Sequence, residues 1–221
     1  DETGNYIVVW KSTNQVSAAS KGDIYFQRFN ANDSKAGIET LVNTTTAGEQ
    51  ERPAVAMNSN GDFVITWASF TDNTSIFDIK ARLYKNNLPA GNEFPVNTTT
   101  LHTQNNPDVD IKNNGEFIIV WDSWFQDESD RGVYAQRFNS TGEKIGSEFR
   151  VNTTTAFSQA KPKVKYRKDG SFIVIWESWR QDIITQSGYG MFGRIFDESA
   201  NPLTGEFQIN THTHDYQWFG D

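Results

Sequence analysis

The sequence predicts an all-β protein, a four-bladed β-propeller built of four-stranded blades. Three observations carry this prediction: one apolar strand motif occurs four times, hairpin signals recur beside it, and the composition favours strands. The 221 residues include 7 Trp, 7 Tyr and 16 Phe, and few stretches show the apolar stripe of a helix. Rings of this size are enriched in strands. An open β-solenoid or a stacked β-sandwich is the alternative architecture.

The repeated motif defines the units of the domain. It reads GNYIVVW at 4–10, GDFVITW at 61–67, GEFIIVW at 115–121 and GSFIVIW at 170–176. Its features recur every 54 to 58 residues, close to the length of a propeller blade. We therefore expect one domain over 1–221, with repeats at about 4–60, 61–114, 115–169 and 170–221. We also expect it to be part of a longer chain or of an assembly.

Each unit begins with a hairpin. Its first strand is PAVAM, PDVDI or PKVKY, and the turns that follow contain Asn60-Gly61, Asn114-Gly115 or Asp169-Gly170. These pairs favour hairpins because the turn requires positive φ. The second strand, such as FIIVW, is apolar at every position. A strand wet on one face would alternate, so the second strand is predicted to be covered on both faces, as in a blade between two others.

Residues that recur in every unit are interpreted as architecture. The recurring residues are Trp10, Trp67, Trp121 and Trp176, then Arg28, Arg82, Arg137 and Arg194, and then Glu39, Glu93, Glu148 and Glu206. The indoles would fill the space between blades, with the serine two positions later as a partner for the N–H. The arginine and glutamate lie on adjacent predicted strands, so we expect a cross-strand ion pair in each blade. An arginine ring facing a ligand is the alternative.

The phrase VNTTT occurs at 42–46, 96–100 and 151–155, and drifts to INTHT at 209–213. One interpretation is structural: Asn and Thr side chains satisfy backbone groups where the chain leaves the sheet. The other is glycosylation, because N-x-Ser/Thr is the acceptor sequence for N-linked glycans. The acceptor sequences place candidate glycans at Asn43, Asn97, Asn152, Asn139, Asn73 and Asn32. Asn210 is excluded because His212 replaces the required Ser or Thr.

The phase of the repeat predicts that the first blade lacks an innermost strand. The motif at 4–10 corresponds to a second strand, and only three residues precede it. A missing strand leaves an open sheet edge, which another segment can pair with. We expect that strand to come from more of the same polypeptide or from a neighbouring subunit, unless the two tails close the blade imperfectly.

Two loops suggest a carbohydrate site. They read SWFQD at 123–127 and SWRQD at 178–182. An indole face can stack on a sugar while neighbouring amides and carboxylates bind its hydroxyls. The candidates are Trp124, Gln126, Asp127, Trp179, Gln181 and Asp182. The alternative, which we favour from the sequence, is that these rings pack against their own loops or a neighbouring subunit.

The sequence offers little for metal or covalent chemistry. Asp127, Glu128 and Asp130, like Asp108 and Asp110, do not match a calcium loop, and acidic surface segments are the favoured interpretation. His212 and His214 are interpreted as part of a solvated tail rather than a metal site. We expect no cofactor, with calcium as the alternative. No cysteine is present, and no common hydrolase or nucleotide-binding motif is found.

The net charge of −8 and the lack of a basic cluster argue against nucleic acid as a partner, and no apolar stretch is long enough for membrane insertion. The segments GEFIIVWDS at 115–123, GVYAQRF at 132–138 and GSEFRVNTTT at 146–155 resemble a tandem repeat of very large extracellular proteins of bacteria and some protists. That resemblance covers nearly the whole chain. It implies a surface, adhesion or matrix component and supplies no catalytic residues.

Together these features predict a non-enzymatic extracellular module of the cell surface. We expect a glycosylated structural or adhesive unit that builds a coat or filament, with copies of itself, adjacent modules of the same chain and attached glycans as partners. A lectin-like, carbohydrate-binding propeller is the alternative.

Overall fold

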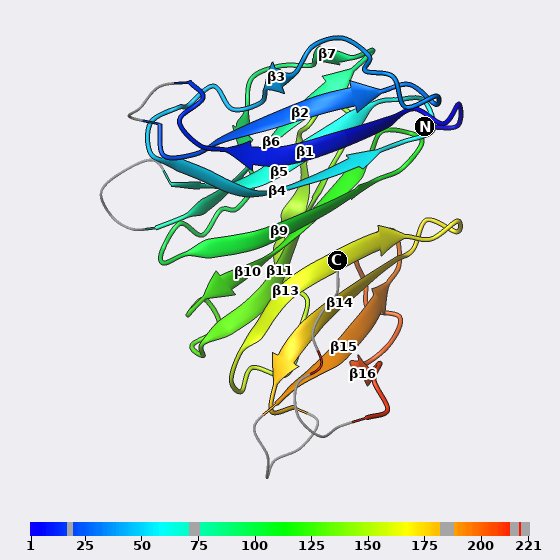
Figure 1. The fold of residues 1–221 in the computed structure, drawn as a ribbon. Helices are drawn as coiled ribbons and strands as arrows, with labels where there is room; N and C mark the ends of the chain where they lie inside the picture. The colour runs from blue at the N-terminus through cyan, green and yellow to red at the C-terminus, as the bar shows by residue number, and fades with distance from the viewer. Residues whose placement is uncertain (17–19, 71–75, 182–187, 213–216, 218–221) are drawn as a thin grey trace.

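The computed structural model describes residues 1–16, 20–70, 76–181, 188–212 and 217, which form strands, turns and loops. Four antiparallel sheets fan out side by side, one for each sequence repeat (Figure 1). The prediction of an all-β propeller with four blades is confirmed. In the described part of the chain, no helix is long and apolar enough to cross a membrane.

The blades follow the chain in order. Blade 1 contains β1 (Tyr6–Ser12), β2 (Asp23–Phe29) and β3 (Thr40–Leu41). Blade 2 contains β4 (Glu49–Met57), β5 (Phe63–Phe70), β6 (Asp78–Lys85), β7 (Leu88–Pro89) and β8 (Phe94–Pro95). Blade 3 contains β9 (Gln104–Ile111), β10 (Phe117–Trp124), β11 (Arg131–Phe138) and β12 (Lys144–Arg150). Blade 4 contains β13 (Gln159–Tyr166), β14 (Phe172–Trp179), β15 (Tyr189–Phe196) and β16 (Phe207–Gln208).

Blade 1 differs from the others in strand number. Its described sheet runs β1-β2-β3, whereas blades 2, 3 and 4 each begin with one strand more, β4, β9 and β13. The expected absence of an innermost strand from blade 1 is confirmed for the described residues. Strands β1, β4, β9 and β13 contact one another in that order, and blade 4 does not pack on blade 1 in the described structure (Figure 1).

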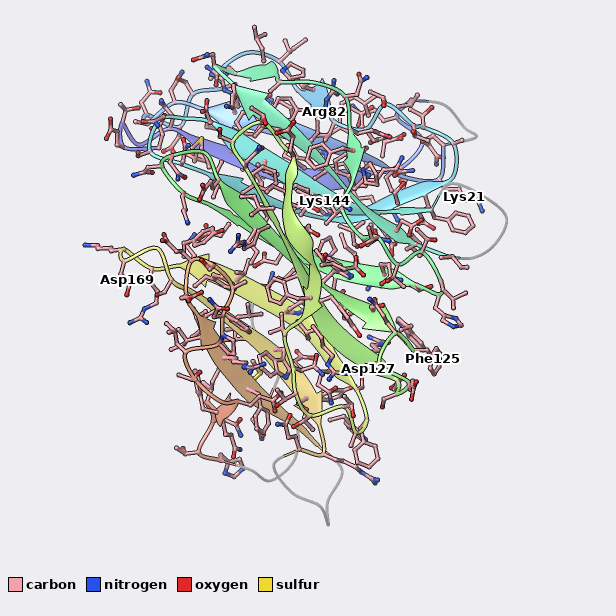
Figure 2. The ribbon with its side chains drawn as sticks, turned by 180° about the vertical axis from the view of Figure 1, so that it is seen from behind. Lys21, Arg82, Phe125, Asp127, Lys144 and Asp169 are labelled. Carbon is pink, nitrogen blue, oxygen red and sulfur yellow. The ribbon has the colours of Figure 1, made fainter. Side chains whose placement is uncertain are left out.

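The predicted hairpin turns are present. Gly61, Gly115 and Gly170 have φ of 83°, 85° and 84°, a region that strongly favours glycine. Figure 2 shows the turn at Asp169 on one side of the molecule and Phe125 and Asp127 on the opposite side. The inner hairpins and the loops after the second strands therefore mark opposite ends of the propeller.

Three apolar layers hold the blades together, one between each pair of neighbours. Trp67 belongs to the layer between blades 1 and 2, Trp121 to the next and Trp176 to the last, and all three are fully buried. This confirms the predicted role of filling between blades for these three tryptophans, whereas Trp10 of blade 1 is half-buried and belongs to none of the layers. The expected serine partner is wrong in blade 2, because Trp67 Nε1 donates to Gln50 Oε1 at 3.0 Å.

The recurring glutamate joins neighbouring blades rather than pairing with arginine. Glu93 of blade 2 accepts from Thr44 N at 2.7 Å and Thr45 Oγ1 at 2.7 Å, both at the end of blade 1. Lys80 also donates to Glu93, at 2.8 Å. Burial alone would raise the pKa of Glu93, but the hydrogen bonds from Lys80, Thr45 and Thr44 outweigh it and lower the pKa to about 2.

This contact, which we call the interblade clamp, recurs at the other two junctions. Glu148 accepts from Thr98 N and Thr99 Oγ1, and Glu206 accepts from Thr154 N and Thr154 Oγ1. The threonines of VNTTT therefore donate the hydrogen bonds that join each blade to the following one. The predicted Arg–Glu ion pair is wrong. Instead, Arg82 and Arg194 each donate to a carbonyl of the preceding blade, at Val42 and Val151.

Candidate functional site

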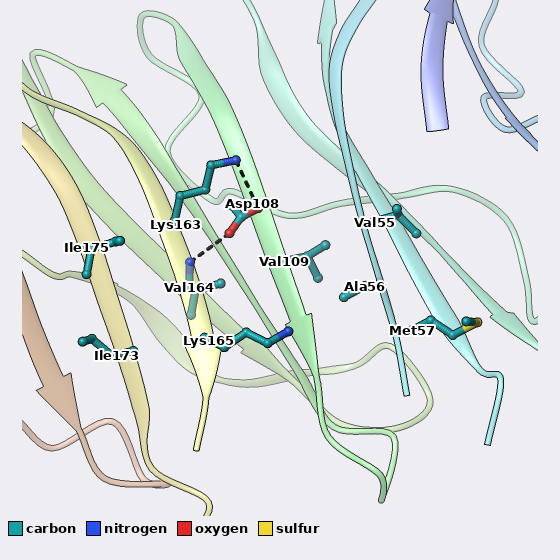
Figure 3. Close-up of a pocket in the computed structure, with 10 residues that line it drawn as sticks. All are labelled: Val55, Ala56, Met57, Asp108, Val109, Lys163, Val164, Lys165, Ile173 and Ile175. Atoms are coloured by element: carbon teal, nitrogen blue, oxygen red, sulfur yellow. Dashed lines mark hydrogen bonds and ion pairs between the residues drawn. The ribbon is translucent and has the colours of Figure 1, made fainter. Parts of the chain in front are cut away.

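Three adjoining cavities follow the inner strands, and we call them together the channel. Its middle section is a cavity of about 560 Å³ between blades 2, 3 and 4 (Figure 3). The cavity is lined by Val55, Ala56, Met57, Asp108, Val109, Lys163, Val164, Lys165, Ile173 and Ile175. Most of these side chains are apolar, and the polar ones come from β9 and β13.

The two aspartates of β9 join it to β13. Asp108 accepts the backbone N–H of Val164 at 2.8 Å, and Asp110 accepts that of Tyr166 at 2.7 Å. Lys165 Nζ lies 2.7 Å from Asp110 Oδ1. Both carboxylates thus replace ladder hydrogen bonds between blades 3 and 4. In the described part of the chain, no three His, Asp or Glu side chains gather as a metal-binding group.

The channel mouth is a second cavity, of about 390 Å³, where the inner strands begin. Arg52, Asn106 and Lys161 stand at equivalent places in the three inner strands, each directly before a proline. Their φ values are 53°, 49° and 49°, which are uncommon for residues other than glycine. Two of these positions coincide with register shifts in β4 and β13. The strained bulges direct the side chains over the mouth.

A polar network connects the mouth residues. Arg52 Nη1 donates to Asn106 Oδ1 at 2.8 Å, and Asn106 Nδ2 donates to Asp122 Oδ2 at 2.6 Å. Arg52 Nε lies 3.2 Å from Glu51 Oε1. Each bulged residue therefore reaches toward an acidic side chain.

Asp122 is fully buried behind Asn106 and Lys161, which line the mouth, and it does not itself line the cavity. Its Oδ2 accepts from Asn106 Nδ2 and from the backbone N–H of Lys161 at 3.0 Å, while its Oδ1 has no hydrogen-bond partner. Burial raises the pKa of Asp122, although the hydrogen bonds from Lys161 and Asn106 oppose the rise. A raised pKa shifts the equilibrium of this carboxyl group toward its neutral form.

Glu177 occupies the same place in blade 4 as Asp122 in blade 3. It is 1% exposed, and Lys161 Nζ lies 3.1 Å from its Oε2. The two carboxylates lie on either side of Lys161, whose backbone contacts one and whose ammonium contacts the other. The mouth thus combines a buried acid with raised pKa and a second buried carboxylate paired with a cation.

These acids stand at a position that varies among the repeats. The residue after the recurring tryptophan is Lys11, Ala68, Asp122 or Glu177. Residues common to all repeats build the blades, whereas this position carries a different side chain each time. Asp122 and Glu177 do not recur among the repeats, so a comparison of recurring residues passes over them. The sequence marks them only by the position after the recurring tryptophan, which varies within an otherwise constant apolar strand.

The predicted carbohydrate loops have a different role. Gln126 donates to Thr99 at 3.0 Å and to Glu148 at 2.8 Å, and Gln181 makes the same contacts with Thr154 and Glu206. These glutamines belong to the interblade clamp, which uses their side-chain N–H groups, and a role for them in sugar binding stays a prediction.

The two loop tryptophans are half-buried. The Arg131 guanidinium lies 4.3 Å from the ring centre of Trp124, and the Tyr189 ring lies edge-on to Trp179 at 4.8 Å. Packing within the loops, the interpretation favoured from the sequence, agrees with these contacts. Asp127 accepts from the Ser129 N–H at 3.2 Å, and Asp182 lies outside the described residues.

The acceptor asparagines of VNTTT are buried. Asn43, Asn97 and Asn152 are 1%, 4% and 1% exposed. Each accepts one backbone N–H through Oδ1, for example that of Ile24 at 2.7 Å, and donates through Nδ2 within its own turn. A glycan would attach to the buried Nδ2, so this burial argues against glycans at the three positions, where glycosylation stays a prediction. The structural interpretation of Asn in this phrase is confirmed.

The remaining glycan candidates lie elsewhere. Asn32 is exposed in a turn of blade 1, and Asn139 is half-buried in a turn of blade 3. Asn73 lies outside the described residues. Glycosylation at Asn32, Asn73 and Asn139 stays a prediction.

No family model matches the sequence, and no curated protein matches it. Solved structures do resemble the fold. An endo-arabinase from Bacteroides thetaiotaomicron matches with a TM-score of 0.50 and 13% identity over 93% of this chain and 78% of that one. A family GH43 endo-arabinanase from Bacillus licheniformis matches at 0.53 and 12%, over 97% and 79%. An α-L-arabinofuranosidase from Fusarium graminearum matches at 0.56 and 8%, over 92% and 66%.

These similarities correct the functional expectation from the sequence. The chain had been expected to be a non-enzymatic structural module, with a lectin-like propeller as the alternative, whereas the similar structures are named as glycoside-cleaving enzymes. At such low identity the likeness establishes the fold alone. Function must therefore be argued from the channel mouth.

Proposed function

We propose that this protein is a glycoside-acting enzyme whose reaction takes place at the channel mouth, with Asp122 and Glu177 as its acidic pair. The observation that carries the proposal is the placement of two buried carboxyl groups at equivalent, repeat-variable positions of adjacent blades. A carboxyl group with a perturbed pKa beside a concave site, as Asp122 is, is typical of catalytic centres. The propeller similarity to arabinan-cleaving enzymes supports the same class of substrate.

The two acids suit the division of labour in glycoside hydrolysis. One carboxylic acid protonates the leaving oxygen, and a second carboxylate acts on water or on the anomeric carbon. Asp122 takes the acid role, because its raised pKa favours the protonated form and its Oδ1 has no protein partner. As the bond from the anomeric carbon to the leaving oxygen breaks, that oxygen takes the proton from Oδ1. Glu177 takes the base role, removing a proton from the water that attacks the anomeric carbon.

Movement of the exposed side chains at the mouth would give the substrate access. The side chains of Arg52 and Lys161 are 47% and 46% exposed and lie over acids that are themselves buried. Long cationic chains of this kind reorient at little cost on the surface. Sugar hydroxyls would take over their hydrogen bonds when the substrate enters.

Arabinan, arabino-oligosaccharides and an aryl α-L-arabinofuranoside are the first substrates to assay. We expect product from the unaltered chain and a loss of at least about 100-fold in kcat/KM with Asp122→Asn or Glu177→Gln, the usual scale for removing an acid or base. The matched control is Glu143→Gln, an exposed acid in a turn of blade 3, which should leave the rate unchanged.

Thermal unfolding of each variant separates chemistry from folding. A variant that unfolds like the unaltered chain but has lost activity supports the assignment. The pH profile gives an independent signature: activity should fall as pH rises through the raised pKa of Asp122, because the acid is then ionised. Absence of any product across these glycosides, or full activity in Asp122→Asn, would overturn the proposal.

A further inference from the structure

Blade 1 carries the glutamate and glutamine of an interblade clamp, without a threonine partner in the described structure. Gln15 donates to Glu39, just as Gln126 donates to Glu148 and Gln181 to Glu206. The loop conformation is also the same, because Asn14, Phe125 and Arg180 have φ of 61°, 54° and 59°. In the described structure, however, no threonine from a preceding blade reaches Glu39, which is exposed.

Blade 4 carries the other half. Asn210 Oδ1 accepts the Met191 N–H at 2.7 Å, and its Nδ2 donates to His212 O at 2.6 Å. Asn43 makes the equivalent bonds at the junction of blades 1 and 2. Thr211 stands where Thr44 donates to a clamp glutamate, and it is exposed. The turn that presents the threonine N–H is thus formed before any partner is bound.

The apolar surface beside each half is also uncovered. On blade 1, Tyr6 and Val8 are 39% and 45% exposed, although Phe117 and Ile119 at the same places in blade 3 are fully buried. On blade 4, Ile209 is 45% exposed, whereas Val42, Val96 and Val151 at that position are fully buried. In the other blades these positions are covered by the next or the preceding blade.

We infer that the exposed face of blade 4 binds the exposed face of blade 1 of a second copy of this chain, repeating the interblade contact between molecules. Glu39 of one copy would accept from the Thr211 N–H of the other, and Tyr6 and Val8 would cover Ile209. One copy presents the two faces at opposite ends of its fan of blades (Figure 1). Because the faces differ, the contact is head-to-tail.

The fit is close but not identical to the internal clamps. His212 replaces the threonine whose hydroxyl binds the glutamate at the other junctions, so one hydrogen bond of the clamp is lost. The backbone donor and the apolar contact remain. We therefore expect association that is reversible and weaker than the internal packing of the blades.

Thiol cross-linking tests the predicted contact directly, because the chain has no cysteine. Gln126 reaches Thr99 at 3.0 Å, and the positions equivalent to these are Gln15 and His212. Gln15→Cys and His212→Cys are prepared as separate proteins and treated with a short bis-maleimide, alone and mixed. We expect a product of doubled mass in the mixture, well above that of either protein alone. The matched control pair is Glu143→Cys with His212→Cys.

Sedimentation of the unaltered chain supplies a second measurement. We expect the average mass of the unaltered chain to rise with its concentration. Glu39→Lys should require at least a tenfold higher concentration for the same rise. Glu143→Lys should behave like the unaltered chain. Three results would overturn the inference: monomers at every concentration, equal cross-linking in the control pair, or a cross-link within one chain in the double variant at high dilution. The last would mean that a single copy closes upon itself.

Discussion

Blades 1 and 3 share a nearly identical second strand, yet they bury it differently. In blade 3, every residue from Phe117 to Ser123 is buried. In blade 1, no residue of β1 is fully buried, and Tyr6 and Val8 are more than a third exposed. Two similar sequences therefore form a core strand, β10, in blade 3 and a surface strand, β1, in blade 1.

The difference arises from the neighbours. Strand β10 is covered by blade 2 on one face and blade 4 on the other. Strand β1 is covered only by blade 2, through Ile7 and Val9. Burial in a repeat protein is thus a property of the interface between units. Identical substitutions in the two blades should therefore change the free energy of unfolding by unequal amounts.

The largest contrast is expected at the tryptophans. Trp121 is fully buried and Trp10 is only half-buried. Trp121→Ala should lower the free energy of unfolding by about 3–5 kcal/mol, because it leaves a large cavity between blades. Trp10→Ala should cost about 1 kcal/mol. Urea denaturation measures both, and equal costs would break the comparison.

Acid sensitivity should separate the filled clamps from the empty one. The pKa of Glu93 is lowered to about 2, so its contribution to stability is present above pH 4.5 and is lost as pH falls from 4.5 toward 2. Glu93→Gln should therefore flatten the decline in unfolding free energy over this window. Glu39→Gln, which touches no neighbouring blade, should leave the decline unchanged. Identical acid profiles for the two variants would contradict the role of the clamp.

A smaller effect of opposite sign is expected at Asp122, which has no acidic counterpart in blade 1. Its pKa is raised by burial, so the contribution of Asp122 to stability is greatest at low pH and declines as pH rises through that raised pKa. Asp122→Asn carries no charge at any pH and should remove this decline. Its Tm relative to the unaltered chain should therefore be higher at pH 8 than at pH 4. A difference in Tm that is constant with pH would argue against the raised pKa.

The smallest effect should come from the exposed face of blade 1. Val8→Ala should change the free energy of unfolding by no more than about 0.5 kcal/mol, as is usual at the surface. Ile119→Ala, at the equivalent place in blade 3, should cost about 2–5 kcal/mol because it opens a buried cavity. Measuring both in dilute protein keeps self-association out of the comparison.

Several features of the fold could be predicted from the sequence because they depend on local patterns. Asn-Gly pairs specify hairpins through backbone geometry, and unbroken apolar strands specify sheets covered on both faces. The motif Gly-x-Phe/Tyr-x-x-x-Trp occurs once in each repeat, so its four copies predict the number of blades. The missing strand of blade 1 followed from the phase of that count.

The candidate site could not be predicted in the same way. Asp122 and Glu177 look unremarkable in the sequence, since each is a single acid after a tryptophan. Two blades place both acids behind the residues that line the channel mouth, where burial raises the pKa of Asp122 and Lys161 contacts both carboxylates. The converse holds for Asn43 and Gln126, which stand out in the sequence: the fold uses their amides for its own hydrogen bonds.

The strands, their turns and the number of blades follow from the sequence alone, because they depend on short-range periodicity and turn chemistry. Contacts between distant segments set which glutamate binds which threonine, which strands are buried, and which variable residues lie behind the channel mouth. Such contacts join residues about 50 positions apart, as Glu93 and Thr44 show with a separation of 49. Their energies depend on burial and distance, which no local pattern contains.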